Sequence, residues 1–273
     1  MLPKVAILRG ERAHETVERA VILSGGVDHL RNSPVLIKVN FICTETWDTG
    51  ATTDPLLVEA LIKIIREATD DIKVVESDAN MTNADKASRA TGMLEMCRRN
   101  DVPFVNLIKE RERVKLRPPE PLALKSIEVP KIVAEGKIVD AAKLKTHSTT
   151  GVTLGMKNLF GLLPKKWKFR YHRKGISKVI VDICSVISPS LVVIDGFMGM
   201  EGQGPVGGKP VKMDLVIAGR ALVETDIVAT RVMGFDPGEI DHIRLALDRG
   251  LGGIEYDVVG NRVDEVSRKF EAP

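Results

Sequence analysis

Cysteine is scarce in this 273-residue chain, which contains three. Cys43, Cys97 and Cys184 lie far apart and form no CxxC pair, so cysteine alone cannot hold a zinc ion or an iron–sulfur cluster. An odd number of cysteines without a disulfide framework is typical of a reducing compartment. We therefore expect a cytoplasmic protein whose own cysteines ligate no iron–sulfur cluster.

Long apolar runs are also missing. The N-terminal segment has a short apolar run before charge returns, too short for a signal peptide or an anchor. No later stretch approaches the roughly 20 apolar residues of a membrane span. The net charge of +3 is too small to indicate a nucleic-acid partner by itself. The composition therefore predicts a soluble globular protein without a membrane partner.

Strand-like and helix-like segments alternate through the first 108 residues. The apolar run at 34–39 is broken only by Lys38 and is typical of a buried parallel strand. Asp54 and Pro55 supply an N-cap and a first helical position for a following helix. The repeated β-loop-α pattern indicates a parallel sheet with helices on its faces. The expected strands are 5–8, 34–39, 72–76 and 102–107, and the expected helices are 14–24, 54–69 and 85–99.

The alternation is interrupted at residues 109–135, where a charged segment, a PPEP breaker and extended segments follow one another. It then resumes. We predict an α/β fold: a mostly parallel, mixed sheet with helices on both faces and a β-rich insertion around 109–135. The chain would form one domain, 1–273, with lobes of about 1–108 and 136–273. The later expected strands are 138–144, 191–195, 215–218 and 254–259, and the later expected helices are 174–187, 223–233 and 240–249.

Polar and ionisable residues are concentrated in the segment 143–164, KLKTHSTTGVTLGMKNLFGLLP. Alternate side chains of a strand share a face, so Lys143, Lys145 and His147 are expected to point the same way. Two buried positive charges would be costly, so this face should meet solvent or an anion. Ligands of open α/β sheets bind beyond the carboxyl ends of the strands, which is where Lys145 and His147 are expected.

A hydroxyl-rich turn at 148–153 leads into a short helix whose free N–H groups favour negative charge. Lys157 lies four residues after Thr153, on the same helical face. The segment therefore predicts a site for phosphate or carboxylate, with His147 as an acid, a base or a metal ligand. The alternative is that the lysines are solvated and His147 is a hydrogen-bonded turn residue. The P-loop pattern is absent.

This segment, together with VLIKVN, the start of a helix at Thr53-Asp54-Pro55 and the run DGFMGMEGQGPVGG, resembles the domain-of-unknown-function family 362. The resemblance implies a soluble α/β protein of undefined biochemistry. Many members carry a ferredoxin module with cysteine-ligated iron–sulfur clusters. This chain resembles the core alone, so a redox role would need a separate ferredoxin-like electron-transfer partner. The arrangement of a histidine near a glycine-rich turn, followed by a lysine, is also locally similar to the core of the nickel-dependent lactate racemases. This local likeness does not imply that the chain has their activity.

Two carboxylates lie in the glycine-rich segment 195–208. Asp195 is expected at the carboxyl end of a strand, and Glu201 on a loop that can fold over a ligand. Either could act as a general base or bind a divalent cation, and the predicted metal ligands are His147, Asp195 and Glu201. The alternative is a mobile surface loop.

Two further groups could contact the same ligand. Lys38 and Asn40 end an early strand and would offer a second anion contact, unless Lys38 reaches water from an edge strand. The segment 165–174, KKWKFRYHRK, alternates basic and aromatic residues and could bind nucleic acid by stacking and phosphate contacts. We favour the alternative, in which the aromatic residues pack on the core. His172 and Arg173 could then reach an anionic substrate.

We therefore predict an enzyme for a small anionic substrate, in which proton transfer beside a carboxylate or phosphate fits the residues best. The alternatives are a nucleic-acid or protein binding module that uses 165–174, and a redox protein that relies on an iron–sulfur partner. The predicted catalytic residues are His147, Lys145, Lys157, Asp195 and Glu201. The predicted substrate contacts are Lys38, Asn40, Asp54, Thr153, Asn158, His172 and Arg173.

Overall fold

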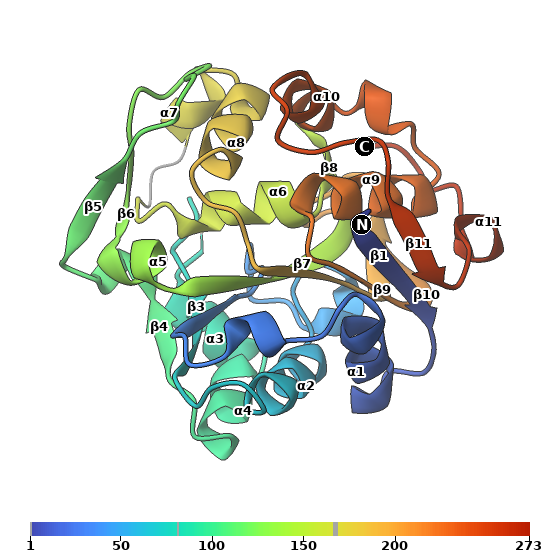
Figure 1. Ribbon diagram of the computed structural model, residues 1–273, viewed down its shortest axis with the longest axis horizontal. Coiled ribbons are helices and arrows are strands. Elements are labelled where there is room, and N and C mark those ends of the chain that lie inside the picture. The colour runs from blue at the N-terminus through green and yellow to red at the C-terminus, as the bar shows by residue number, and fades with distance from the viewer. Residues whose placement is uncertain (1, 81, 166–168) are drawn as a thin grey trace.

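A mixed sheet runs through the centre of the molecule in the computed structural model, which describes residues 2–80, 82–165 and 169–273 (Figure 1). Within these residues nine strands form one sheet. They are β1 (Lys4–Arg9), β2 (Val35–Lys38), β3 (Ile72–Glu76), β4 (Phe104–Asn106), β7 (Lys137–His147), β8 (Gly151–Thr153), β9 (Leu191–Glu201), β10 (Lys209–Gly219) and β11 (Asp257–Gly260). The order is β11-β1-β10-β9-β7-β2-β3-β4, with β8 paired to β7.

Most neighbouring strands are parallel. β2 pairs in parallel with β3 and β7, β3 with β4, β7 with β9, and β1 with β11. The antiparallel pairs are β1 with β10, β10 with β9, and β7 with β8. This arrangement confirms the predicted α/β fold with a mostly parallel, mixed sheet.

Helices cover both faces of the sheet, as Figure 1 shows. One face carries α1 (His14–Leu23), α2 (Pro55–Ile65), α3 (Ala84–Ala90) and α4 (Met93–Arg99). The other carries α6 (Gly155–Asn158), α8 (Ile176–Cys184), α9 (Leu222–Val232) and α10 (Asp241–Asp248). Val35 and Ile37 belong to the core under the first group, and Leu36 to the core under the second. Burial on both faces explains why β2 reads as a continuous apolar run.

The two sides of the insertion share this sheet. β2, from the first part of the chain, lies beside β7, and β1 lies beside β10. The insertion holds β5 (Arg113–Leu116) and β6 (Ile127–Pro130), which pair antiparallel in a separate two-stranded sheet. A short helix that the sequence pattern did not predict follows, α5 (Lys131–Glu135). Two other short helices are α7 (Phe169–His172) and α11 (Val263–Val266).

The expected start of the second helix is confirmed, because the Asp54 side chain accepts a hydrogen bond from the Leu56 N–H at 2.9 Å and Pro55 opens α2. The single helix expected over 85–99 is wrong. α3 ends at Ala90, and α4 starts at Met93 after Gly92, which has a φ of 78°. A left-handed residue breaks the run of helical hydrogen bonds.

The glycine-rich loop expected after Asp195 is also corrected. β9 continues to Glu201 and pairs with β10 along this stretch, with Gly199 opposite Val211. The glycines serve close packing here: a Cβ at Gly199 would lie 2.9 Å from the Leu144 carbonyl oxygen. In the described residues, no helix combines the length and the apolar character that crossing a membrane requires.

Candidate functional site

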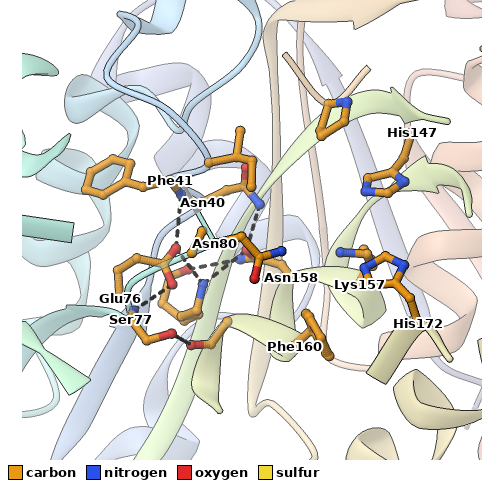
Figure 2. A pocket seen from close by; sticks show the side chains of 15 residues that line it. Asn40, Phe41, Glu76, Ser77, Asn80, His147, Lys157, Asn158, Phe160 and His172 are labelled. Atoms are coloured by element: carbon orange, nitrogen blue, oxygen red, sulfur yellow. Dashed lines mark hydrogen bonds and ion pairs between the residues drawn. The ribbon is translucent and has the colours of Figure 1, made fainter. Parts of the chain in front are cut away.

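A pocket opens at the carboxyl ends of β2, β3 and β7, where a ligand site was expected. Its volume is about 220 Å³. Figure 2 shows side chains from several separate segments converging on it. Six residues singled out from the sequence line it: Lys38, Asn40, His147, Lys157, Asn158 and His172.

An ion pair between Lys38 and Glu76 forms the floor of the pocket. Lys38 is fully buried, and its Nζ lies 2.9 Å from Glu76 Oε2 and 3.2 Å from Asn158 Oδ1. The Glu76 carboxylate also accepts hydrogen bonds from the backbone N–H groups of Phe41 and Ser77, at 3.0 and 2.8 Å. Lys38 therefore neither reaches water nor lies on an edge strand. The floor is charged but internally neutralised.

Two amides form one wall, and charged neighbours fix their orientation. Asn158 Oδ1 accepts from Lys38 and, at 2.8 Å, from Asn40 Nδ2, while Asn158 Nδ2 donates to Asp140 Oδ1 at 2.6 Å. Asn40 Oδ1 accepts from Lys145 Nζ at 2.8 Å. Burial raises the pKa of Asp140 well above its usual range, which favours a neutral, protonated carboxyl group. The side-chain amides of Asn40 and Asn158 are thus each fixed in one orientation, because exchanging the oxygen and nitrogen would break these hydrogen bonds.

Lys143 and Lys145 do not line the pocket, and they correct the expectation that this face of β7 meets solvent or an anion. Both are fully buried. Lys143 Nζ forms an ion pair with Asp195 Oδ2 at 2.8 Å, and Lys145 Nζ donates to Asn40 and to the Ala51 carbonyl. Burial lowers the pKa of Lys145 to about 7. These ion-pair and hydrogen-bond partners offset the free-energy cost of burying the two amines.

Lys157, on α6, differs from these lysines because its amine has no hydrogen-bonding partner in the part of the chain that the structure describes. Among the described residues, its Nζ has no hydrogen bond or ion pair, and it lies 5.0 Å from the centroid of the Phe160 ring. Burial, and then the charge of Lys38, lower the pKa of Lys157 to about 8, while Glu76 opposes this shift. The pocket therefore contains an amine that no carboxylate of the described chain neutralises.

His147 presents a neutral ring to the same pocket. Its Nδ1 accepts a hydrogen bond from the Thr149 N–H at 3.1 Å, which places the ring hydrogen on Nε2 in the neutral form. Burial, together with the charges of Lys157 and Lys145, lowers the pKa of His147 to about 2. Figure 2 shows the ring beside Lys157 and His172. In this state His147 can donate a hydrogen bond through Nε2 and is a poor base.

The other predicted site residues do not line the pocket. Asp195 and Asp54 belong to a separate cluster with Lys143 and Arg12, which we call the ionic layer. In it, Asp195 accepts from the Asp54 N–H at 2.9 Å and Asp54 binds Arg12. Thr153 is buried on β8, and Arg173 is exposed. Glu201 lies near the C-terminal segment, 3.4 Å from Arg268.

The predicted metal ligands have other partners. Asp195 binds Lys143 and Glu201 binds Arg268. Over residues 2–80, 82–165 and 169–273, no group of three or more His, Cys, Asp or Glu side chains could hold a metal ion. The divalent metal thus stays a prediction, and His147, Asp195 and Glu201 are not assembled as its ligand set.

Several pocket residues were missed by sequence reasoning. Glu76 ends β3 next to the end of β2, so its position at the end of a predicted neighbouring strand was a usable signal. His242, which is not one of the lining residues, gave no such signal: it is fully buried on α10, and neither ring nitrogen has a partner within the described chain. Burial, and then Lys157, lower its pKa to about 3. The other missed lining residues include Phe41, Ser77, Asn80, Phe160 and Pro205.

The basic and aromatic segment is partly helical. Residues 166–168, part of the alternation expected there, lie outside the described residues. Residues 169–172 form α7, and the Tyr171 ring meets the Phe160 ring edge-on, with 5.6 Å between their centroids. His172 lines the pocket. This end of the segment therefore packs beside the pocket.

The chain is similar to a known protein in sequence and to a solved structure. The chain is 27% identical over 213 residues to the thylakoid-associated protein sll1697 of Synechocystis sp., an alignment that covers 76% of this chain and 64% of that protein. The chain thus spans less than two thirds of that relative's length. The lactate racemase apoprotein of Thermoanaerobacterium thermosaccharolyticum is a structural neighbour with a TM-score of 0.44 and 12% identity, covering 83% of this chain and 56% of that one. Residues 35–231, which include Lys38, His147 and Lys157, match the family described as "Domain of unknown function (DUF362)", and the chain belongs to that family.

Proposed function

We propose that this protein is an enzyme that binds a small carboxylate or phosphate in the pocket at the strand ends. One observation carries the proposal: Lys157 lines the pocket without a counter-charge in the described chain, whereas Lys38, Lys143 and Lys145 are all held by protein acceptors. An anion would supply the missing partner.

The hydrogen-bonding groups around Lys157 also suit an oxyanion. His147 offers its Nε2–H, and Asn40 has a second N–H beyond the one bound to Asn158. The carboxylate on the floor, Glu76, is occupied by Lys38 and two backbone N–H groups, which limits its repulsion of an incoming anion. A hydrogen bond to a charged group contributes about 1.5–3 kcal/mol.

Lys157 is the residue of this pocket best suited to acid–base chemistry. Its pKa of about 8 lies close to neutral pH, where a group can both take up and release a proton. His147, with a pKa lowered to about 2 by burial and nearby lysines, remains neutral and orients an oxygen of the ligand through Nε2–H. We therefore assign proton transfer to Lys157 and orientation to His147, which reverses the emphasis drawn from the sequence.

Calorimetric titration of the full chain with pyruvate and with inorganic phosphate tests this proposal. We expect the wild type to bind at least one of the two, and Lys157→Ala and His147→Ala to bind it more weakly. Lys178→Ala removes an exposed lysine of α8 and serves as the matched control, with unchanged binding. Equal affinity in Lys157→Ala and the wild type would contradict the proposal, as would the absence of binding by the wild type.

A further inference from the structure

We propose that Lys157 forms a Schiff base with the carbonyl carbon of a small α-oxo acid, which defines the substrate class of the pocket. This inference rests on the proposed function, because the carboxylate of the oxo acid is the anion that the pocket would hold. It adds a covalent step that anion binding alone does not require.

The availability of the Lys157 amine distinguishes it from its neighbours. A lysine attacks a carbonyl through the lone pair of its neutral amine, and an amine held in an ion pair is kept protonated. Lys38 and Lys143 lie 2.9 and 2.8 Å from carboxylate oxygens. Lys145 donates to an amide and a carbonyl and does not line the pocket. Lys157 has no such acceptor in the described chain, and its Nζ lies 5.0 Å from the centroid of the Phe160 ring.

The surroundings of Lys157 favour its neutral form. The ammonium of Lys38 belongs to the floor of the same pocket, and its counter-ion Glu76 is shared with two backbone N–H groups. A lysine that is desolvated beside another cation is an activated nucleophile. The lowered pKa of Lys157, about 8, agrees with this geometry and leaves about half of the amine neutral at pH 8.

The step balances without an added oxidant or reductant. The Lys157 nitrogen forms a bond to the carbonyl carbon, the carbonyl π electrons move to oxygen, and one amine hydrogen follows to give a carbinolamine. The C–O bond then breaks, and the oxygen leaves as water with the second amine hydrogen, which yields the imine. His147 Nε2–H can donate a hydrogen bond to the departing oxygen. A proton from solvent converts the imine to an iminium, which keeps a positive charge beside the carboxylate.

Reductive trapping tests the inference. The full chain is incubated with pyruvate at pH 8 and treated with borohydride, and the adduct is located by peptide mass mapping. We expect an adduct at Lys157, with a yield that rises from pH 6 to pH 9 as the amine becomes neutral. Lys157→Arg keeps the positive charge but cannot form an imine, so it should bind pyruvate and show no adduct at this position. Lys178→Ala should react like the wild type.

The outcomes separate the two proposals. Pyruvate binding without an adduct at Lys157 overturns the Schiff base and leaves the anion site intact. An adduct spread equally over exposed lysines overturns it too, because it shows no special reactivity at Lys157. If the wild type binds neither pyruvate nor phosphate, both proposals fail. Circular dichroism of Lys157→Arg establishes that it is folded, and Lys157→Met supplies a smaller replacement that should lose the adduct and weaken binding together.

Discussion

Two lysines near the carboxyl ends of the strands, Lys143 and Lys157, differ in what surrounds them. In the ionic layer, Lys143 meets Asp195, whose carboxylate also accepts from the Asp54 N–H, and Asp54 binds Arg12. In the pocket, Lys157 meets an aromatic ring and no carboxylate of the described chain. Both lysines come from one 22-residue segment of sequence. Their partners, and not their charge, distinguish these two lysines, and the ligand-binding role proposed for Lys157 rests on this difference.

The largest expected effect is the loss of a counter-charge in the ionic layer. Asp195→Ala should lower the free energy of unfolding by about 3–5 kcal/mol, because it leaves the buried Lys143 unpaired. Urea denaturation measures this change. The double variant Lys143→Met with Asp195→Ala should recover most of the loss, since no unpaired charge remains. A loss below 1 kcal/mol in the single variant would contradict this prediction, because it would show that Lys143, like Lys157, does not need a carboxylate partner.

A smaller loss of stability is expected from a substitution at Gly161, whose backbone lies against the ion pair on the pocket floor. A Cβ at Gly161 would lie 2.5 Å from Lys38 Cε and 2.6 Å from Glu76 Oε1. Gly161→Ala should therefore cost about 1–3 kcal/mol of stability and weaken anion binding by displacing the ion pair. Thermal unfolding and titration with phosphate measure the two effects. Gly253→Ala, where the nearest atom would be 3.8 Å away, is the matched control and should change neither.

Lys157→Met should separate binding from stability. The variant loses a charge-assisted contact, so we expect anion affinity to fall by roughly tenfold to a hundredfold. Its free energy of unfolding should stay equal or rise slightly, because a desolvated cation without a partner is removed. Titration calorimetry and urea denaturation of the same samples give both values. A strong loss of stability would show that Lys157 resembles Lys143 after all.

The pH dependence of the free energy of unfolding should also show that Lys157 is a buried amine without a counter-charge from the described chain. The pKa of Lys157 is lowered by burial to about 8, below its usual 10.5, so between these values the unfolded chain binds more protons than the folded one. The free energy of unfolding should therefore rise with pH through this window, and the penalty is fully present below about pH 8. The difference between the wild type and Lys157→Met isolates this contribution from that of Lys145. Anion binding should weaken as the pH rises through about 8, where the folded Lys157 amine loses its charge. A flat stability difference between the wild type and Lys157→Met would contradict the assignment.

The smallest effect concerns His147, whose charge should not change near neutral pH. Its pKa, lowered to about 2 chiefly by burial, predicts a neutral ring from pH 5 to pH 8 with the hydrogen on Nε2. Nitrogen-15 chemical shifts of the labelled histidines distinguish this tautomer from the others. An imidazolium signal at pH 6 would instead support the acid–base role first predicted for His147.

Much of the site could be predicted from local pattern. The apolar run at 34–39 indicated a buried strand, and its end placed Lys38 and Asn40 at the edge of the sheet where the pocket lies. Strand alternation placed Lys143 and Lys145 on one face of β7. The turn and short helix that follow brought Lys157 to the same edge. These inferences succeeded because helix and strand periodicity act over a few neighbouring residues.

The partners of these residues depended on the tertiary structure. Asp195 neutralises Lys143 because β9 lies beside β7, and Glu76 neutralises Lys38 because β3 lies beside β2. The sequence by itself determined most of the elements, the edge of the sheet at which the pocket lies and most of the cations near it. Only the tertiary structure decided which cations are neutralised and that Lys157 is not, because the counter-charges come from residues far away in the chain and strand pairing sets their distances.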